Sequence, residues 1–218
     1  MTSTHESTRA QSPDRQGRRT MSEKRRALQR LEISRAAVRL FREQGVAETS
    51  GEQIAAAVGL SVRTLWRYFR NKESCVEPLL SQAVDRLVDT LKDWPEGQSL
   101  EEYLVAGEPP EHVTADAEAA LAVVRMSRDE PALRAIWLVT HERAEGILAE
   151  LIAQRLDRSV EDLAVRVQAA TLNTALRITL EDLAVTDCTE GGAIDDGPSR
   201  LFEAIRAATH GVLGSQTM

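Results

Sequence analysis

The sequence has only two cysteines, Cys75 and Cys188, and they lie far apart along the chain. Two distant thiols form neither a disulfide framework nor a zinc site, so we expect both to be ordinary reduced side chains. No apolar run approaches the roughly 18 residues that cross a bilayer, and the polar start of the chain lacks the apolar middle of a secretion signal. These absences predict a cytoplasmic protein that does not contact a membrane.

The sequence motifs of the common enzyme classes are also missing. None of the four histidines lies in a His-Glu-x-x-His arrangement, and there is no glycine-rich phosphate loop. His112 and Asp116 are one helical turn apart, a spacing that suits a metal, but a solvated helix start explains the pair better. We therefore expect a protein that is not an enzyme and that holds no cofactor and no metal.

Charge is divided unevenly along the 218 residues. Residues 1–72 carry 15 Lys and Arg against 7 Asp and Glu, a balance of +8, whereas the rest of the chain has a balance of -15. A basic module joined to an acidic remainder is expected when one part of a protein binds a polyanion. The net charge of -7 conceals this division.

Apolar residues recur at helical spacing along most of the chain, and no segment alternates like a strand. The pattern predicts an all-α protein of about nine helices, near residues 23–44, 53–58, 61–69, 71–92, 99–106, 113–127, 131–156, 159–185 and 198–212. We expect a disordered basic arm over residues 1–22, a helix-turn-helix domain over 23–70 and a larger helical domain over 71–218. Pro78 falls two turns into the predicted fourth helix, where it predicts a kink that is either a hinge or a static bend for packing.

Residues 49–69 carry the strongest local pattern. Ser50 and Gln53 form a capping box for one short helix, Gly59 suits a left-handed turn, and Ser61 caps a second short helix. Two short helices joined by a glycine turn predict a helix-turn-helix, whose second helix fits a major groove about 12 Å wide. Binding to double-stranded DNA is therefore the predicted function.

The first turn of the second short helix places Val62, Arg63 and Thr64 near base edges, and the residues that follow can donate to phosphates. The N-terminus of the preceding helix, beside Thr49 and Ser50, offers another seat for a phosphate. The predicted DNA-binding residues are Thr49, Ser50, Ser61, Val62, Arg63, Thr64, Trp66, Arg67, Tyr68 and Lys72. The arm arginines Arg15, Arg18 and Arg19 are interpreted first as part of a solvated tail, and the alternative is that they add contacts to phosphates or the minor groove.

The segment from Ile33 to Leu80 resembles the N-terminal domain of the TetR family of bacterial transcriptional repressors. The matching residues are Ile33, Ala36, Ala37, Leu40, Phe41, Gly45, Thr49, Ile54, Ala55, Ala57, Gly59, Leu60, Ser61, Thr64, Leu65, Tyr68, Phe69, Lys72 and Glu73. Trp66 stands where the family commonly has Tyr. The resemblance implies a three-helix DNA-binding domain, a helical ligand-binding and dimerisation domain, and a homodimer that a small-molecule effector releases from its operator.

The rest of the chain gives weaker predictions. Residues 129–182 resemble a largely actinobacterial subgroup that includes mycofactocin-associated regulators. Polar side chains on otherwise apolar helix faces are the candidate ligand-binding residues, namely Arg125, Met126, Trp137, Thr140, His141, Asn173, Thr174 and Arg177. Apolar stripes on the last two helices predict a homodimer that binds a palindromic operator. The alternative is a DNA-binding architectural protein that is independent of ligand or controlled by a protein partner.

Overall fold

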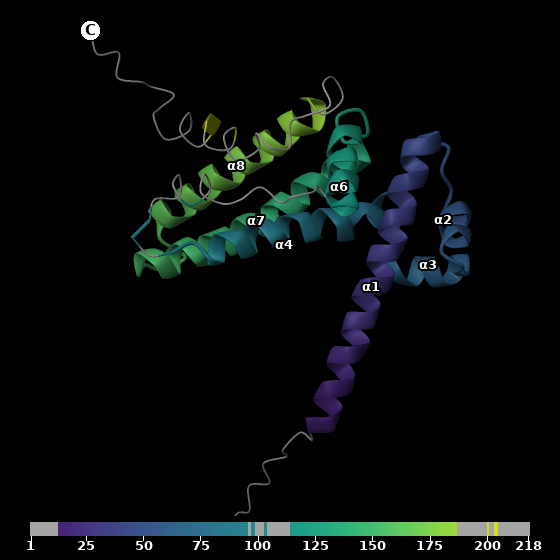
Figure 1. Ribbon diagram of the computed structural model, residues 1–218, viewed down its shortest axis with the longest axis horizontal. Coiled ribbons are helices and arrows are strands. Elements are labelled where there is room, and N and C mark those ends of the chain that lie inside the picture. The colour runs from purple at the N-terminus through teal and green to yellow at the C-terminus, as the bar shows by residue number, and fades with distance from the viewer. Residues whose placement is uncertain are drawn as a thin grey trace, which may run out of the picture.

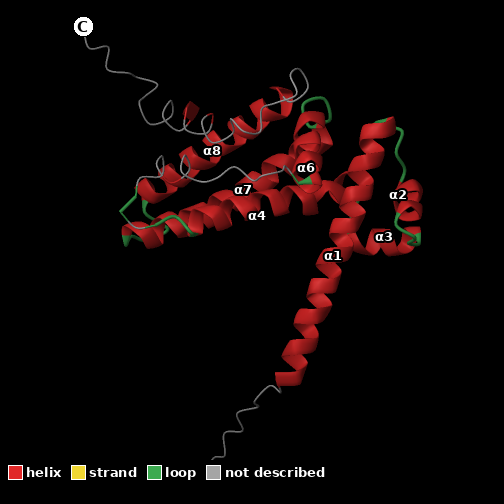
Figure 2. Cartoon of the chain, viewed as in Figure 1, coloured by secondary structure: helices red, strands yellow, loops and turns green. Residues whose placement is uncertain are grey.

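The computed structural model describes residues 13–95, 97–98, 103, 114–186, 200 and 203–204. Every regular element within these ranges is a helix, which confirms the predicted all-α class (Figure 2). They hold seven α-helices and one 3₁₀ helix instead of nine helices: α1 Pro13–Gln44, α2 Gly51–Ala57, α3 Val62–Tyr68, η1 Glu73–Val76, α4 Glu77–Lys92, α6 Ala115–Met126, α7 Pro131–Leu156 and α8 Leu163–Thr186. The helices predicted near 99–106 and 198–212 lie largely outside the described residues.

The first helix, α1, has 32 residues and is therefore about 48 Å long. Its N-terminal half projects past the rest of the molecule as a rod (Figure 1). The prediction of a disordered arm is wrong for residues 13–22, which are helical; residues 1–12 lie outside the described ranges. Absence of burial had predicted disorder, but these residues continue a helix that is anchored further along, and Pro13 suits its first position.

The helices form a head and a body on opposite sides of α1 (Figure 1). In the head, α2 and α3 pack on one another and α2 packs on the C-terminal half of α1. In the body, α7 packs along both α4 and α8, and α6 contacts α4 and α8. Arg35 of α1 donates two hydrogen bonds of 2.7 Å to Asp116 at the start of α6, which fastens α1 to the body.

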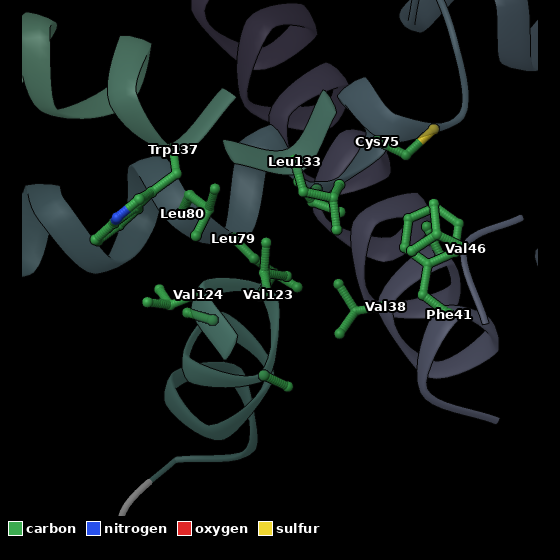
Figure 3. Close-up of a cluster of buried hydrophobic side chains, with 14 of the residues drawn as sticks. Val38, Phe41, Val46, Cys75, Leu79, Leu80, Val123, Val124, Leu133 and Trp137 are labelled. Atoms are coloured by element: carbon green, nitrogen blue, oxygen red, sulfur yellow. The ribbon is translucent and has the colours of Figure 1, made fainter. Parts of the chain in front are cut away.

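One apolar core crosses from the head into the body. Val38 and Phe41 of α1 are buried in the same cluster as Leu79 of α4, Val123 of α6 and Leu133 of α7 (Figure 3). Because close-packed interiors transmit displacement, a shift of the body helices is felt at α1. The head is therefore not packed separately from the body.

Pro78 does not kink a helix. The predicted fourth helix divides into η1 and α4, and α4 begins at Glu77, so Pro78 lies in the first turn. An N–H in the first turn has no partner inside the helix, so its absence in proline costs no hydrogen bond there. The predicted kink is therefore wrong, and the basis for a hinge at Pro78 disappears with it.

Candidate nucleic-acid interface

The turn between α2 and α3 has the geometry that its sequence predicts. Ser50 caps α2, and its capping box with Gln53 is complete. Gly59 has a φ of +66°, in the left-handed region that favours glycine, and the next N–H, of Leu60, donates to Ala55 O at 2.9 Å. Ser61 then caps α3 by accepting from the N–H of Thr64. Local side chains thus fix the entry of both helices.

Helix α3 buries one face and exposes the other. Leu65 is fully buried and Phe69 nearly so, as predicted from their spacing. Arg63, Trp66 and Arg67 are exposed, and neither arginine forms a hydrogen bond or ion pair with any residue that the structure describes. The predicted base reader Arg63 is therefore available to a ligand.

The other predicted base readers are less free. Val62 is half-buried and packs against the core cluster. The hydroxyl groups of Thr64 and Ser61 lie 2.8 Å apart and bond to one another. Both hydroxyl groups therefore take part in capping the start of α3. Of the three predicted base readers, Arg63 is the one whose side chain is exposed.

Trp66 packs its indole ring on Gly51, the first residue of α2. A Cβ added at Gly51 would lie 2.1 Å from Cζ2 of Trp66, far inside van der Waals contact. The backbone of Gly51 is not in the left-handed region, so it is space and not φ that requires glycine here. Trp66 keeps 41% of its surface exposed, so it both braces α2 and faces outward.

Gly51→Ala is therefore expected to lower the free energy of unfolding by roughly 1–3 kcal/mol, the usual cost of overpacking. In a Trp66→Ala background the same change should be neutral or slightly stabilising, because alanine favours a helix over glycine. Urea unfolding of the four proteins in this double-mutant cycle measures the coupling. An equal cost in both backgrounds would show that the indole ring is not what excludes a side chain at Gly51.

The N-terminus of α2 is not the open phosphate seat that the sequence predicts. Thr49 is 1% exposed, and its hydroxyl donates to Gly45 O at 2.8 Å. The carboxyl group of Glu52 accepts hydrogen bonds from the backbone N–H of Glu52 and from the Ser50 hydroxyl, and these bonds lower its pKa. An ionised carboxylate at this position repels an incoming phosphate. Ser50 remains partly exposed, but Thr49 is a structural residue.

Lys72 also departs from its predicted role as a phosphate contact. Its Nζ donates to three backbone carbonyls of the segment that joins α1 to α2: Val46 O at 2.6 Å, Thr49 O at 2.8 Å and Ala47 O at 3.1 Å. An ammonium has three N–H donors, so all are committed. Lys72 holds the connection between the first two helices and leaves no donor for DNA.

The ring of Tyr68 contacts two cationic side chains. The guanidinium carbons of Arg26 in α1 and Arg67 in α3 lie 5.8 Å and 5.7 Å from the centre of its ring. Sequence analysis found Tyr68 and Arg67 but missed Arg26, because residues 26 and 67 come together only in the folded chain. The expected contacts of Arg15, Arg18 and Arg19 lie outside the side chains that the structure describes, although all three residues belong to α1.

A second group of charges joins the head to the body. Arg30 donates to Tyr68 O at 2.7 Å, stacks on the ring of Phe69 at 4.5 Å and pairs with Glu77 at 3.3 Å. Arg143 of α7 reaches the same carboxylate at 2.6 Å. A cleft of about 460 Å³ lies beside these residues, between the head and α7. Glu77 thus connects α1 of the head to α7 of the body.

Four of the predicted ligand-binding residues meet inside the body, between α7 and α8. His141 stacks edge-on against Trp137, with ring centres 4.1 Å apart, and its Nδ1 lies 2.8 Å from Asn173 Oδ1. The indole N–H of Trp137 donates to Glu181 at 2.9 Å, and Arg177 donates to the same carboxylate oxygen. Glu181 is the residue that the sequence analysis missed, because its neighbours are assembled from two helices.

His141 is 4% exposed, and its Nε2 has no hydrogen-bond partner. Burial lowers the pKa of the imidazole, although the hydrogen bond to Asn173 opposes this shift, so the ring is neutral at pH 7. A buried polar atom without a partner is uncommon in a folded protein and calls for a ligand or a water molecule. This nitrogen is therefore left without a hydrogen-bond partner inside the body.

The remaining predicted ligand residues have other surroundings. Thr140 is buried and donates to Ile136 O, and Arg125 donates to Ala184 O at 2.8 Å. Met126 packs against the apolar core. Thr174 is exposed on the outer side of α8, so the structure does not bring it to the buried group.

Comparison with known proteins bears on the head. Residues 33–79 match the family described as "Bacterial regulatory proteins, tetR family". This span covers the packed half of α1, all of α2 and α3, and the start of α4. Over this span, the chain is similar to the TetR family.

Individual relatives extend the similarity beyond the head. The HTH-type transcriptional regulator TcmR of Streptomyces glaucescens is 30% identical over 141 residues, which cover 61% of this chain and 62% of TcmR. The chain therefore matches less than two thirds of that relative. A putative TetR-family regulator from Rhodococcus sp. has 22% identity and a TM-score of 0.54, covering 81% of this chain and 95% of its own. A putative TetR-family regulator from Mesorhizobium loti MAFF303099 has 19% identity and a TM-score of 0.50, and the match covers 84% of this chain and 96% of that protein.

These three relatives are named as transcriptional regulators. None of these matches supports the predicted likeness to the mycofactocin-associated subgroup. Over the described part of the chain, no three potential metal ligands converge. No helix in these ranges is long and apolar enough to cross a bilayer.

Proposed function

We propose that the protein is a homodimeric transcriptional repressor that binds a palindromic operator through α3 and leaves it when a small-molecule effector binds the body. The exposed face of α3 carries this proposal, because Arg63 and Arg67 form no hydrogen bond or ion pair with any described residue, on a helix whose other face is fixed in the core. A capped helix of seven residues fits the major groove, where a guanidinium can take guanine O6 and N7 together. Charge favours the same partner, since the first third of the chain is basic.

The outer side of α8 supports the dimer. Leu163, Val167 and Ile178 lie along this helix and are 72%, 54% and 49% exposed. A second copy that covers these side chains would remove them from water and place two α3 helices about 34 Å apart, one duplex turn. A twofold protein reads a twofold site, so we expect a palindromic operator.

The buried group around His141 supports an effector site. Because Nδ1 of the neutral ring donates to Asn173 Oδ1, the unpartnered Nε2 can accept a hydrogen bond from one polar group of an otherwise apolar molecule. The Trp137 ring lies beside it. A molecule bound there separates or reorients α7 and α8, which share the core with α1. An effector acts only if it binds the released state more tightly, and a difference of 2–3 kcal/mol lowers operator occupancy roughly 30- to 150-fold.

Selection of bound duplexes from random DNA tests the proposal. The wild-type protein should recover a palindrome with half-sites one turn apart. Arg63→Gln should weaken binding by roughly 1–3 kcal/mol and relax base preference at one position of each half-site. Arg128→Gln removes the same charge from the exposed turn after α6 and should leave both unchanged. Recovery of no consensus by the wild-type protein would contradict sequence-specific binding.

A further inference from the structure

A small cleft lies between the projecting half of α1 and the end of α3. It has a volume of about 250 Å³ and is lined by Ser22, Arg25, Arg26, Arg67 and Tyr68. We refer to these five residues as the arginine cradle. Nothing in the fold of the three-helix head requires it, since residues 21–28 of α1 are all exposed and contribute nothing to the core.

The charge of the arginine cradle is of one sign. Three of its five residues are arginines, and none is acidic. None of the three guanidinium groups forms an ion pair or hydrogen bond with any residue that the structure describes, although each has donors to spare. The guanidinium carbons of Arg26 and Arg67 both lie close to one ring, that of Tyr68, at 5.8 Å and 5.7 Å from its centre. Like charges that converge without a carboxylate repel one another, so the arrangement gains stability when an anion enters.

The location of the cradle identifies the anion. Arg67 belongs to α3, so the cleft adjoins the face that meets the major groove, and α1 carries the other two arginines outward along its projecting half (Figure 1). We propose that the arginine cradle binds one phosphate of the DNA backbone outside the bases that α3 reads, so that each half-site extends beyond the major-groove contact. This inference rests on the proposed function.

A rigid rod suits this role better than a flexible arm. A disordered arm loses conformational entropy when it settles on DNA, whereas Arg25 and Arg26 are already placed on a helix continuous with the head. The planar guanidinium group can also hold two phosphate oxygens at once. The cradle therefore fixes the angle between the head and the duplex as well as adding affinity.

Neutral methylphosphonates, placed one at a time along the selected operator, test the cradle. For wild-type protein, one position flanking each half-site should weaken binding about tenfold. Arg25→Gln/Arg26→Gln should bind the natural operator about tenfold more weakly and be insensitive to that one substitution, and its slope of log affinity against log salt should fall by about 1 per half-site. Thermal unfolding at the wild-type midpoint would show that the variant is folded.

Arg39→Gln/Arg42→Gln is the matched control, because it removes the same charge from the same helix beside α6 and away from α3. It should keep both the sensitive position and the salt slope. If Arg25→Gln/Arg26→Gln keeps that sensitivity, the cradle does not hold the phosphate, whereas DNA binding itself stands. Absence of selective binding by the wild-type protein would instead overturn the proposed function.

Discussion

Lys72→Met is expected to lower the free energy of unfolding by roughly 2–4 kcal/mol, since three backbone carbonyls lose a charged donor. Methionine keeps most of the side-chain volume, so the loss reports on the ammonium group. Chemical unfolding followed by circular dichroism measures it. The connection from α1 to α2 should loosen first, because Lys72 reaches it from across the head.

The DNA-binding behaviour of the same variant separates the two roles of Lys72. A lost phosphate contact reduces the salt slope of binding by about 1, whereas a loosened head weakens binding without changing the slope. We expect the second result. Lys92→Met is the control: Lys92 is exposed and pairs only with nearby Asp89, so stability should change by less than about 0.5 kcal/mol. Unchanged stability with a reduced slope in Lys72→Met would restore the phosphate role.

Glu181→Ala is expected to destabilise the body by roughly 2–3 kcal/mol. One carboxylate oxygen accepts from Arg134 at 2.5 Å, and from the Trp137 indole and Arg177 at 2.9 Å each. Its removal leaves two neighbouring guanidinium groups with no anion between them. Urea unfolding at pH 7 measures the loss.

Glu181→Gln retains an oxygen acceptor and removes the charge, so its cost should lie between those of wild type and alanine. Exposed Glu150→Ala, on α7, is the control for loss of a carboxylate and should change stability by less than about 0.5 kcal/mol. If Glu181→Ala matches Glu150→Ala, then the three donors find other partners, and the buried group does not depend on Glu181.

Local chemistry explains which features were predictable from sequence. Ser50, Ser61 and Gly59 act through atoms a few residues away, so their spacing alone predicts both caps and the turn. The bounds of α7 were likewise predictable, since Pro131 marks its start and its apolar period continues to its end. The fold class and the position of α3 could therefore be predicted from the sequence.

Long-range partners explain what was not predictable. The carbonyls that occupy Lys72 lie 23 to 26 residues away, and Glu181 meets Trp137 across 44 residues. The charge of Lys72, and its place after α3, suit a phosphate contact. Only the fold shows that its three N–H groups already donate to backbone carbonyls. The N-terminal half of α1 was missed for a related reason, because a helix that buries nothing has no apolar period.

The continuity of α1 also gives the molecule a lever. Arg35 fastens the helix to the body, and Arg25 lies ten residues away, about 15 Å along the axis. A tilt of about 10° at that fulcrum would swing the distant side chain by roughly 3 Å, the length of a hydrogen bond. A movement of the body too small to disturb the packing of the head would then be large enough at Arg25 to form or break the proposed contact between the arginine cradle and a DNA phosphate.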